Sequence, residues 1–89
     1  MQHQHVSERA VKRLSRIEGH VRGIREMVAT GRDCGEVLIQ IAAVRAAVDQ
    51  VGRLILEDHL GECITAAMAE GKGQEAIDDL KIALKRFIG

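Results

Sequence analysis

The sequence predicts an all-α fold of three helices with a long central helix. Apolar residues recur at alternating steps of three and four, which is the period of a helix that buries one face. The chain has no proline and a single aromatic residue, Phe87, and small, aliphatic and charged residues dominate, as is typical of helical proteins. Its 89 residues form one domain whose core is thin, so we expect oligomerisation to complete that core.

The first predicted helix runs from about Glu8 to Ala29. Ser7 is expected to cap its start and Thr30-Gly31 to end it, which leaves residues 1–7 as a flexible tail. Its apolar positions follow the helical period at Ala10, Leu14, Ile17, Val21, Ile24 and Val28. Residues 1–33 contain seven basic and four acidic side chains, whereas the rest of the chain is acidic. This imbalance predicts an anionic partner for the first helix.

The second predicted helix begins near Asp33 and has no strong stop before Glu70–Gly73, a length of about 50 Å. Its apolar stripe consists of Cys34, Val37, Ile41, Val44, Val48, Val51 and Ile55. The third predicted helix runs from about Gln74 to Phe87 and turns four apolar residues inward, Ile77, Leu80, Leu84 and Phe87. The shorter first and third helices cannot cover the long apolar stripe of the second helix. The alanine-rich segment 41–48 of that helix would allow another helix to approach closely. We therefore predict that two copies pair antiparallel.

Cysteine and histidine residues on the second helix suggest a metal site shared by two chains. His59 and Cys63 are four residues apart and share a helix face, whereas Cys34 lies about 37 Å from His59 along a helix. In an antiparallel pair centred near residues 47–48, Cys34 of one chain lies opposite His59 and Cys63 of the other. A cysteine on an apolar stripe is also common as a small core residue, so the spacing leaves both interpretations open.

Two thiolates and an imidazole form a soft ligand set that suits Cu(I), or Zn(II) or Ni(II) with a further ligand. His3 or His5 is a candidate for that ligand, unless the N-terminal residues are only a disordered tip. His20 is expected to be an exposed or helix-packing histidine and not a ligand. Because the chain has neither a signal peptide nor a membrane-spanning apolar run, we expect a cytoplasmic protein with reduced thiols.

The sequence resembles the CsoR/RcnR family of bacterial metal-responsive repressors in RLSRIEGHVRGIREMV, DCGEVLIQIAAVRAAVDQVGRLILEDHLGEC and GQEAIDDL. The resemblance implies a three-helix fold, antiparallel dimers that pair into a homotetramer, and operator DNA that is released when metal binds, so that export or detoxification genes are transcribed. Cys34, His59 and Cys63 match the ligands of the Cu(I)-sensing branch. That branch places an acidic residue of the third helix beside the ligating histidine, and Asp79 occupies this position. Asp33 replaces the usual tyrosine before the first cysteine, so it is a second candidate for this contact.

The other branches of the family resemble the sequence less closely. Ni(II)/Co(II) sensors share an N-terminal histidine but usually have histidine in place of Cys63, although some nickel sensors share this ligand trio and add a histidine. Formaldehyde sensors have proline at position 2, which is Gln2 here. Persulfide sensors lack the histidine at His59. The resemblance therefore favours copper, with nickel as the alternative inducer.

The distribution of positive charge predicts binding to double-stranded operator DNA. The candidate contacts lie on the first and second helices at Arg9, Lys12, Arg13, Arg16, Arg45 and Arg53. Without the resemblance, an ordinary solvated helix face would explain them, but a tetramer repeats the patch four times and produces the surface that a duplex requires. A metal-buffering or thiol-redox protein without a DNA role is the other interpretation. No nucleophile–base set or cofactor motif is present, so we do not expect an enzyme.

Overall fold

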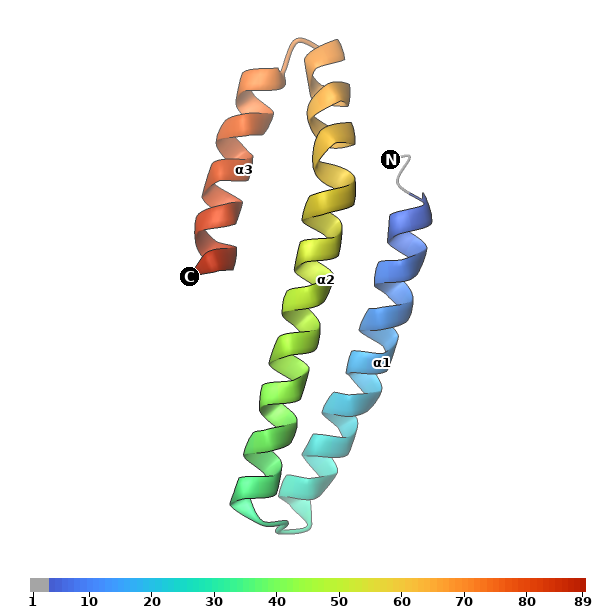
Figure 1. Ribbon diagram of the computed structural model, residues 1–89, viewed down its shortest axis with the longest axis vertical. Coiled ribbons are helices and arrows are strands. Elements are labelled where there is room, and N and C mark those ends of the chain that lie inside the picture. Colours follow the sequence, from blue (N-terminus) through green and yellow to red (C-terminus); the bar gives the residue numbers. More distant parts are fainter. Residues whose placement is uncertain (1–3) are drawn as a thin grey trace.

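The computed structural model describes residues 4–89, which form three helices joined by two short turns (Figure 1). Helix α1 spans Gln4–Ala29, α2 spans Cys34–Ala69 and α3 spans Gly73–Ile88. The side chains of residues 4–7, 58–61 and 63 lie outside the described part of the structure. No strand occurs in residues 4–89, so the predicted all-α class is confirmed.

The start of α1 differs from the prediction. The helix begins at Gln4, so Ser7 lies inside it and does not cap it, and residues 4–7 are helical where a flexible tail was expected. No proline or glycine precedes Ser7 to stop the helix. A serine cap contributes only about 1 kcal/mol, whereas an established helix gains a backbone hydrogen bond with each added residue.

Both turns end their preceding helix with a glycine in the left-handed conformation. Gly31 has φ +74° and Gly71 has φ +76°. After α1 the Arg32 N–H donates to the Met27 carbonyl at 2.9 Å, and after α2 the Lys72 N–H donates to the Ala67 carbonyl at 2.7 Å. These bonds satisfy carbonyl groups that a helix end leaves unpaired, and they confirm Thr30-Gly31 and the Glu70–Gly73 segment as the helix stops.

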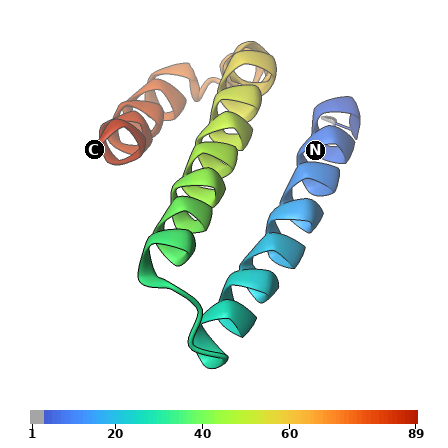
Figure 2. The ribbon, with the colours of Figure 1, turned by 60° about the horizontal axis from the view of Figure 1, so that its bottom comes forward.

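Helix α2 is the axis of the molecule. Its 36 residues span about 54 Å, which accounts for the longest dimension of 55 Å. Helices α1 and α3 lie on opposite sides of α2 (Figures 1 and 2), and within the described residues they do not contact each other. Each of them runs antiparallel to the part of α2 that it covers. A broad surface of α2 is consequently left without a neighbour.

The hydrophobic core of the single chain is very small. Among the described residues only Ala10, Val51 and Leu54 are buried, and Ile17 packs against them. Many large apolar side chains remain exposed, including Leu38, Ile39, Val48 and Ile82. The accessible surface is 6974 Å², compared with about 5,200 Å² for a compact monomer of this mass. No described helix is long and apolar enough to cross a membrane.

Candidate metal site and nucleic-acid interface

One line of residues on α2 is left uncovered by α1 and α3. Cys34, Ile41, Val48 and Ile55 recur every seven residues, a spacing that keeps them on one side of a helix. The three aliphatic side chains are 44%, 45% and 41% exposed, and Cys34 is an exposed free thiol. We call these four residues the α2 stripe. Val51 and Leu54, by contrast, turn toward α1 and are buried.

The predicted ligands His59 and Cys63 lie beyond the last residue of the α2 stripe. They follow Ile55 by four and eight residues, which places their backbone positions on the same side of α2. Their side chains are outside the described part, as are those of His3 and His5. Among the described side chains, no group of three His, Cys, Asp or Glu residues could hold a metal ion.

The continuity of α2 separates the two halves of the predicted ligand set. Cys34 is its first residue, and no break interrupts the helix before His59. The 25 intervening steps correspond to about 37 Å. Cys34 and His59 of one chain therefore cannot bind the same ion.

Two close approaches fix how α3 lies along α2. A Cβ atom added at Gly52 would lie 2.7 Å from Cζ of Phe87, and one added at Gly73 would lie 2.6 Å from Cγ of Met68. Between these contacts the antiparallel helices run side by side (Figure 1). Residues 77–81 of α3 consequently lie level with residues 59–63 of α2. Asp79, the predicted partner of the ligating histidine, belongs to this segment, and its side chain is exposed.

Asp33, the second predicted partner of the metal site, has a local structural contact. Its Oδ2 accepts a hydrogen bond from the Glu36 backbone N–H at 3.3 Å, so Asp33 caps the start of α2. The Glu36 carboxylate in turn pairs with the Arg32 guanidinium at 2.8 Å. An acidic cap also interacts favourably with the positive end of the helix dipole. This carboxylate thus stabilises the helix that begins with Cys34.

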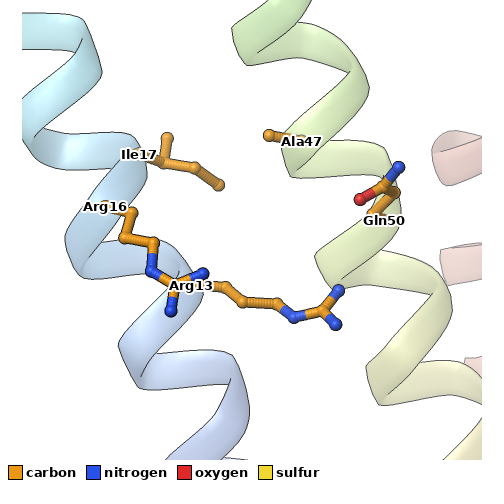
Figure 3. Close-up of a pocket in the computed structure, with 5 residues that line it drawn as sticks. All are labelled: Arg13, Arg16, Ile17, Ala47 and Gln50. Carbon is orange, nitrogen blue, oxygen red and sulfur yellow. The ribbon is translucent and has the colours of Figure 1, made fainter.

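Two of the predicted DNA-binding residues line a groove between α1 and α2 (Figure 3). The groove has a volume of about 290 Å³, and its walls are Arg13, Arg16, Ile17, Ala47 and Gln50. Arg13 extends from α1 toward α2, and Arg16 lies one turn away on the same helix (Figure 3). An anionic group at this groove would meet two guanidinium groups, which suit phosphate oxygens because they offer several N–H donors.

The structure does not bring the six predicted DNA contacts onto one face. Arg9 and Lys12 are exposed on α1, near the groove arginines in sequence, and Arg45 and Arg53 are exposed on α2. Arg45 precedes Gln50 by five residues, or about 140° around the helix. It therefore projects from a different side of α2 than the residues that line the groove.

The polar partners of α1 on α2 were not predicted from the sequence. Nε2 of His20 donates to Oε1 of Gln40 at 2.6 Å and joins the two helices, so His20 is a helix-packing residue as predicted. Gln50 and Ala47 complete the groove with Arg13. A glutamine on an otherwise apolar side of a helix is the signal that could have identified Gln40, because a partly buried amide needs a partner.

Comparison with known proteins gives consistent matches. A model of the family described as metal-sensitive transcriptional repressor matches residues 6–86. The copper-sensing transcriptional repressor CsoR of Bacillus subtilis is 44% identical over 80 residues, which cover 90% of this chain and 79% of that protein. CsoR of Mycobacterium ulcerans is 38% identical over 76 residues, which cover 85% of this chain and 65% of that protein.

Two solved structures extend these matches to the fold. The copper-sensing repressor CsoR with Cu(I) from Geobacillus thermodenitrificans has a TM-score of 0.83 and 43% identity, covering 92% of this chain and 85% of that one. The nickel-responsive transcriptional regulator InrS has a TM-score of 0.70 and 59% identity, covering 90% of each chain. The family consists of transcriptional repressors and not of enzymes. Taken with the match over residues 6–86, these likenesses show that the chain belongs to the family of metal-sensitive transcriptional repressors.

Proposed function

We propose that this protein represses transcription by binding operator DNA as a metal-free oligomer, and that Cu(I) binding releases it. The observation that carries the proposal is the continuous helix α2, which places Cys34 and the His59/Cys63 pair at opposite ends of one uncovered apolar stripe. Such a stripe requires a partner helix, and an identical antiparallel helix brings the two halves of the ligand set together. The regulated genes would encode metal export or detoxification, and the protein would act in the cytoplasm.

The repeat of the α2 stripe supports a specific pairing. With Val48 on the two-fold axis, facing residues of the two helices have numbers that add to about 96. Ile41 then lies opposite Ile55 of the partner subunit, and Cys34 lies level with residue 62, between the partner's His59 and the partner's Cys63. Two equivalent sites form in each dimer, and each takes one thiolate from one chain and a thiolate and an imidazole from the other.

The size of the exposed surface supports more than one interface. The chain exposes roughly 1,800 Å² more than a compact monomer of its mass, and a typical protein interface buries about 800 Å² on each partner. The excess therefore corresponds to about two interfaces for each chain. A dimer built on the α2 stripe that pairs again into a tetramer would cover this area and would repeat the basic groove four times.

The donor set suits Cu(I) without further ligands. Two thiolates and one imidazole form a soft, three-coordinate arrangement that Cu(I) accepts. An imidazole that binds metal through one ring nitrogen can donate the N–H of its other ring nitrogen to an acceptor, and Asp79 lies on the segment of α3 that runs beside His59. Metal binding would then draw α3 against α2 and disfavour the DNA-binding arrangement of the oligomer, a coupling of about 1–3 kcal/mol.

Nickel is a second candidate inducer, and one observation favours it. The nickel-responsive regulator InrS is 59% identical to this chain over 90% of its length, compared with 43% for the Cu(I)-bound CsoR structure. Ni(II) prefers four ligands in a square-planar arrangement, so it would need one more donor than the trio supplies. His3 and His5 are the candidates for this fourth ligand.

The deciding experiment is a DNA-binding titration under anaerobic conditions with Cu(I), Ni(II), Zn(II) and formaldehyde in separate arms. We expect operator affinity to fall at least tenfold with Cu(I) at one equivalent per chain, and to change little with the other inducers. Release by Ni(II) alone would identify the nickel alternative, and release by formaldehyde would indicate a thiol-based sensor. Metal binding by a chain that shows no affinity for duplex DNA would instead indicate a metal-buffering protein.

The shared site makes a separate prediction about mixed dimers. Cys34→Ala chains and His59→Ala chains should each lose Cu(I) binding when they form dimers alone. Random mixing should restore about a quarter of the sites, because each mixed dimer retains one complete site. Copper stoichiometry after refolding of the mixture measures this recovery. A verified mixed dimer without recovered sites would exclude a site shared between subunits.

A further inference from the structure

We infer that Phe87 of one protomer positions Arg45 of its partner, with the guanidinium group stacked on the ring across the dimer interface. The inference rests on the antiparallel dimer of the proposed function and adds a contact that the metal site and the α1–α2 groove do not contain. It connects α3 of one chain to a basic residue of the other.

The Phe87 side chain packs against the backbone of α2. Its ring lies directly against the backbone at Gly52, where an added Cβ atom would be 2.7 Å from Cζ and 3.3 Å from Cδ1. Only glycine leaves room for the ring at this distance. The side chain is nevertheless 41% exposed, so one part of the ring is in contact with α2 while another part is free for a further contact.

The ring of Phe87 lies at the border of the α2 stripe. Gly52 lies four residues after Val48 and three before Ile55, so it borders the stripe. Arg45 has the same relation to Ile41 and Val48, because it precedes Gly52 by one seven-residue repeat. Arg45 and the ring on Gly52 therefore occupy the same shoulder of the surface that faces the partner helix.

The two-fold symmetry of the proposed dimer brings Arg45 and the partner's Phe87 together. A two-fold axis at Val48 brings equivalent shoulders of the two helices together, and facing residue numbers that add to about 96 place Arg45 level with residue 51 of the partner subunit. The partner's Phe87, seated on the partner's Gly52, is then its neighbour. Helix axes in such packings lie about 8–10 Å apart, a distance that an arginine side chain spans.

The chemistry of the two groups fits this arrangement. Arg45 is exposed, and within the described part of its own chain it makes no hydrogen bond or ion pair. A guanidinium group is attracted to an aromatic face and stacks on it in plane. Stacking uses the face of the group and leaves its N–H edge free, so an Arg45 held in this way can still contact a DNA phosphate as predicted from the sequence.

The contact would give the metal site a route to the partner chain. Helix α3 runs beside residues 59–63, which contain two of the proposed ligands, and Phe87 is in its last turn. Any movement of α3 toward the metal would therefore also move the ring under Arg45 of the partner subunit. Phe87 acts in this scheme as a positioning residue and does not touch metal or DNA.

The test uses the fact that Phe87 is the only Phe, Tyr or Trp residue in the chain. We expect the Nε–Hε proton of Arg45 to show an upfield ring-current shift in the wild-type dimer, and to lose it in dimers of the Phe87→Leu variant. Isotopically labelled Phe87→Leu chains paired with unlabelled wild-type chains should regain the shift at Arg45, because the ring then comes from the partner. Arg25, an exposed arginine of α1, is the control and should not shift.

A measurement without a variant complements this one. In mixed dimers of labelled and unlabelled wild-type chains, isotope-filtered spectra should show nuclear Overhauser contacts between Arg45 of one chain and ring protons of the other. A chain that sediments as a dimer or tetramer and binds Cu(I) but shows neither these contacts nor the regained shift would overturn the stacking and leave the proposed function intact. A monomeric chain without Cu(I) binding would overturn both.

Discussion

The two arginines of the α1–α2 groove differ in how far the protein already holds them. Arg13 is partly buried and reaches toward α2, whereas Arg16 is exposed. A guanidinium group that is held in place loses less side-chain entropy when it binds an anion. At the scale of single residues, we therefore expect Arg13 to contribute more to DNA affinity than Arg16.

Substitution of these arginines should show whether they contact DNA phosphates or belong to an ordinary solvated helix face. Arg13→Ala should weaken operator binding and reduce the slope of log affinity against log salt by about one unit, because one phosphate contact is lost. Arg16→Ala should give a smaller loss, and Cu(I) affinity should not change in either. Fluorescence anisotropy at several salt concentrations measures both quantities. Arg25→Ala, an exposed arginine of α1 outside the groove, is the control, and an equal loss there would indicate only nonspecific charge.

The role of Asp79 can be tested separately from metal affinity. Asp79→Asn should retain most of the Cu(I) affinity but should lose much of the release from DNA, because the amide is a poorer acceptor for an imidazole N–H than the carboxylate. The measured quantity is the ratio of DNA affinities without and with saturating Cu(I). Asp78→Asn is the matched control, since Asp78 accepts a hydrogen bond from Gln74 within α3. If the Asp79 variant keeps the wild-type ratio, the signal leaves the metal site through another residue.

Among the helices, α2 has three sides with different surroundings. One side buries Val51 and Leu54 against α1, a second receives Phe87 of α3 at Gly52, and the α2 stripe between them is uncovered. A continuous helix that packs against a neighbour on two sides keeps the distance between its two ends fixed. The continuous helix therefore holds Cys34 and His59 apart in one chain, and in the proposed antiparallel pair it would keep them in register with the partner's ligands.

The packing of α3 on α2 depends on the missing side chain at Gly52. Gly52→Ala should lower the free energy of unfolding by about 1–2 kcal/mol, because the overlap with Phe87 outweighs the gain in helix propensity. Gly23→Ala in α1 is the matched control: nothing lies within 4 Å of its added Cβ, so alanine should raise the stability by about 0.5–1 kcal/mol. Urea unfolding at equal chain concentration compares the two. Stabilisation by both alanines would mean that Phe87 is not seated on Gly52.

At the scale of the whole molecule, the chain is an extended and incompletely buried structure. Its radius of gyration is 17.1 Å, compared with about 12 Å for a compact domain of this length. The three residues that are buried in the described part of the chain cannot offset the conformational entropy of ordering the helices. We therefore expect association to contribute a large part of the free energy that stabilises this fold, so that stability rises with protein concentration.

A charge at the proposed two-fold axis tests this association directly. Val48→Glu should dissociate the dimer and abolish both Cu(I) and operator binding, since two carboxylates would face each other in a desolvated interface. Ile39→Glu is the control because Ile39, 69% exposed, projects from nearly the opposite side of α2. The Ile39→Glu variant should preserve the dimer and the metal site. If this variant no longer forms a tetramer, Ile39 belongs to the interface between the two dimers. Sedimentation velocity at several concentrations measures the oligomeric state of both variants. A Val48→Glu variant that remains dimeric would exclude pairing through the α2 stripe.

The class of the fold and most of the helix limits could be predicted from local sequence features. Glycines that must adopt positive φ ended α1 and α2 where the pattern placed them, and Asp33 began α2 as a side chain suited to a helix cap. These features depend on neighbouring residues, so local chemistry decides them. The start of α1 was predicted wrongly, because no single residue before Glu8 compels a helix to begin or to stop there.

The side on which each helix meets its neighbour could not be predicted from the sequence and follows from the packing of the three helices. The heptad spacing of α2 did not reveal that Val51 and Leu54 face α1, that Phe87 rests on Gly52, or that Arg45 projects away from the groove of Arg13. These relations depend on how helices far apart in the chain rotate and slide against one another. The free energy that selects them comes from side-chain packing between elements, which the period of one helix does not specify.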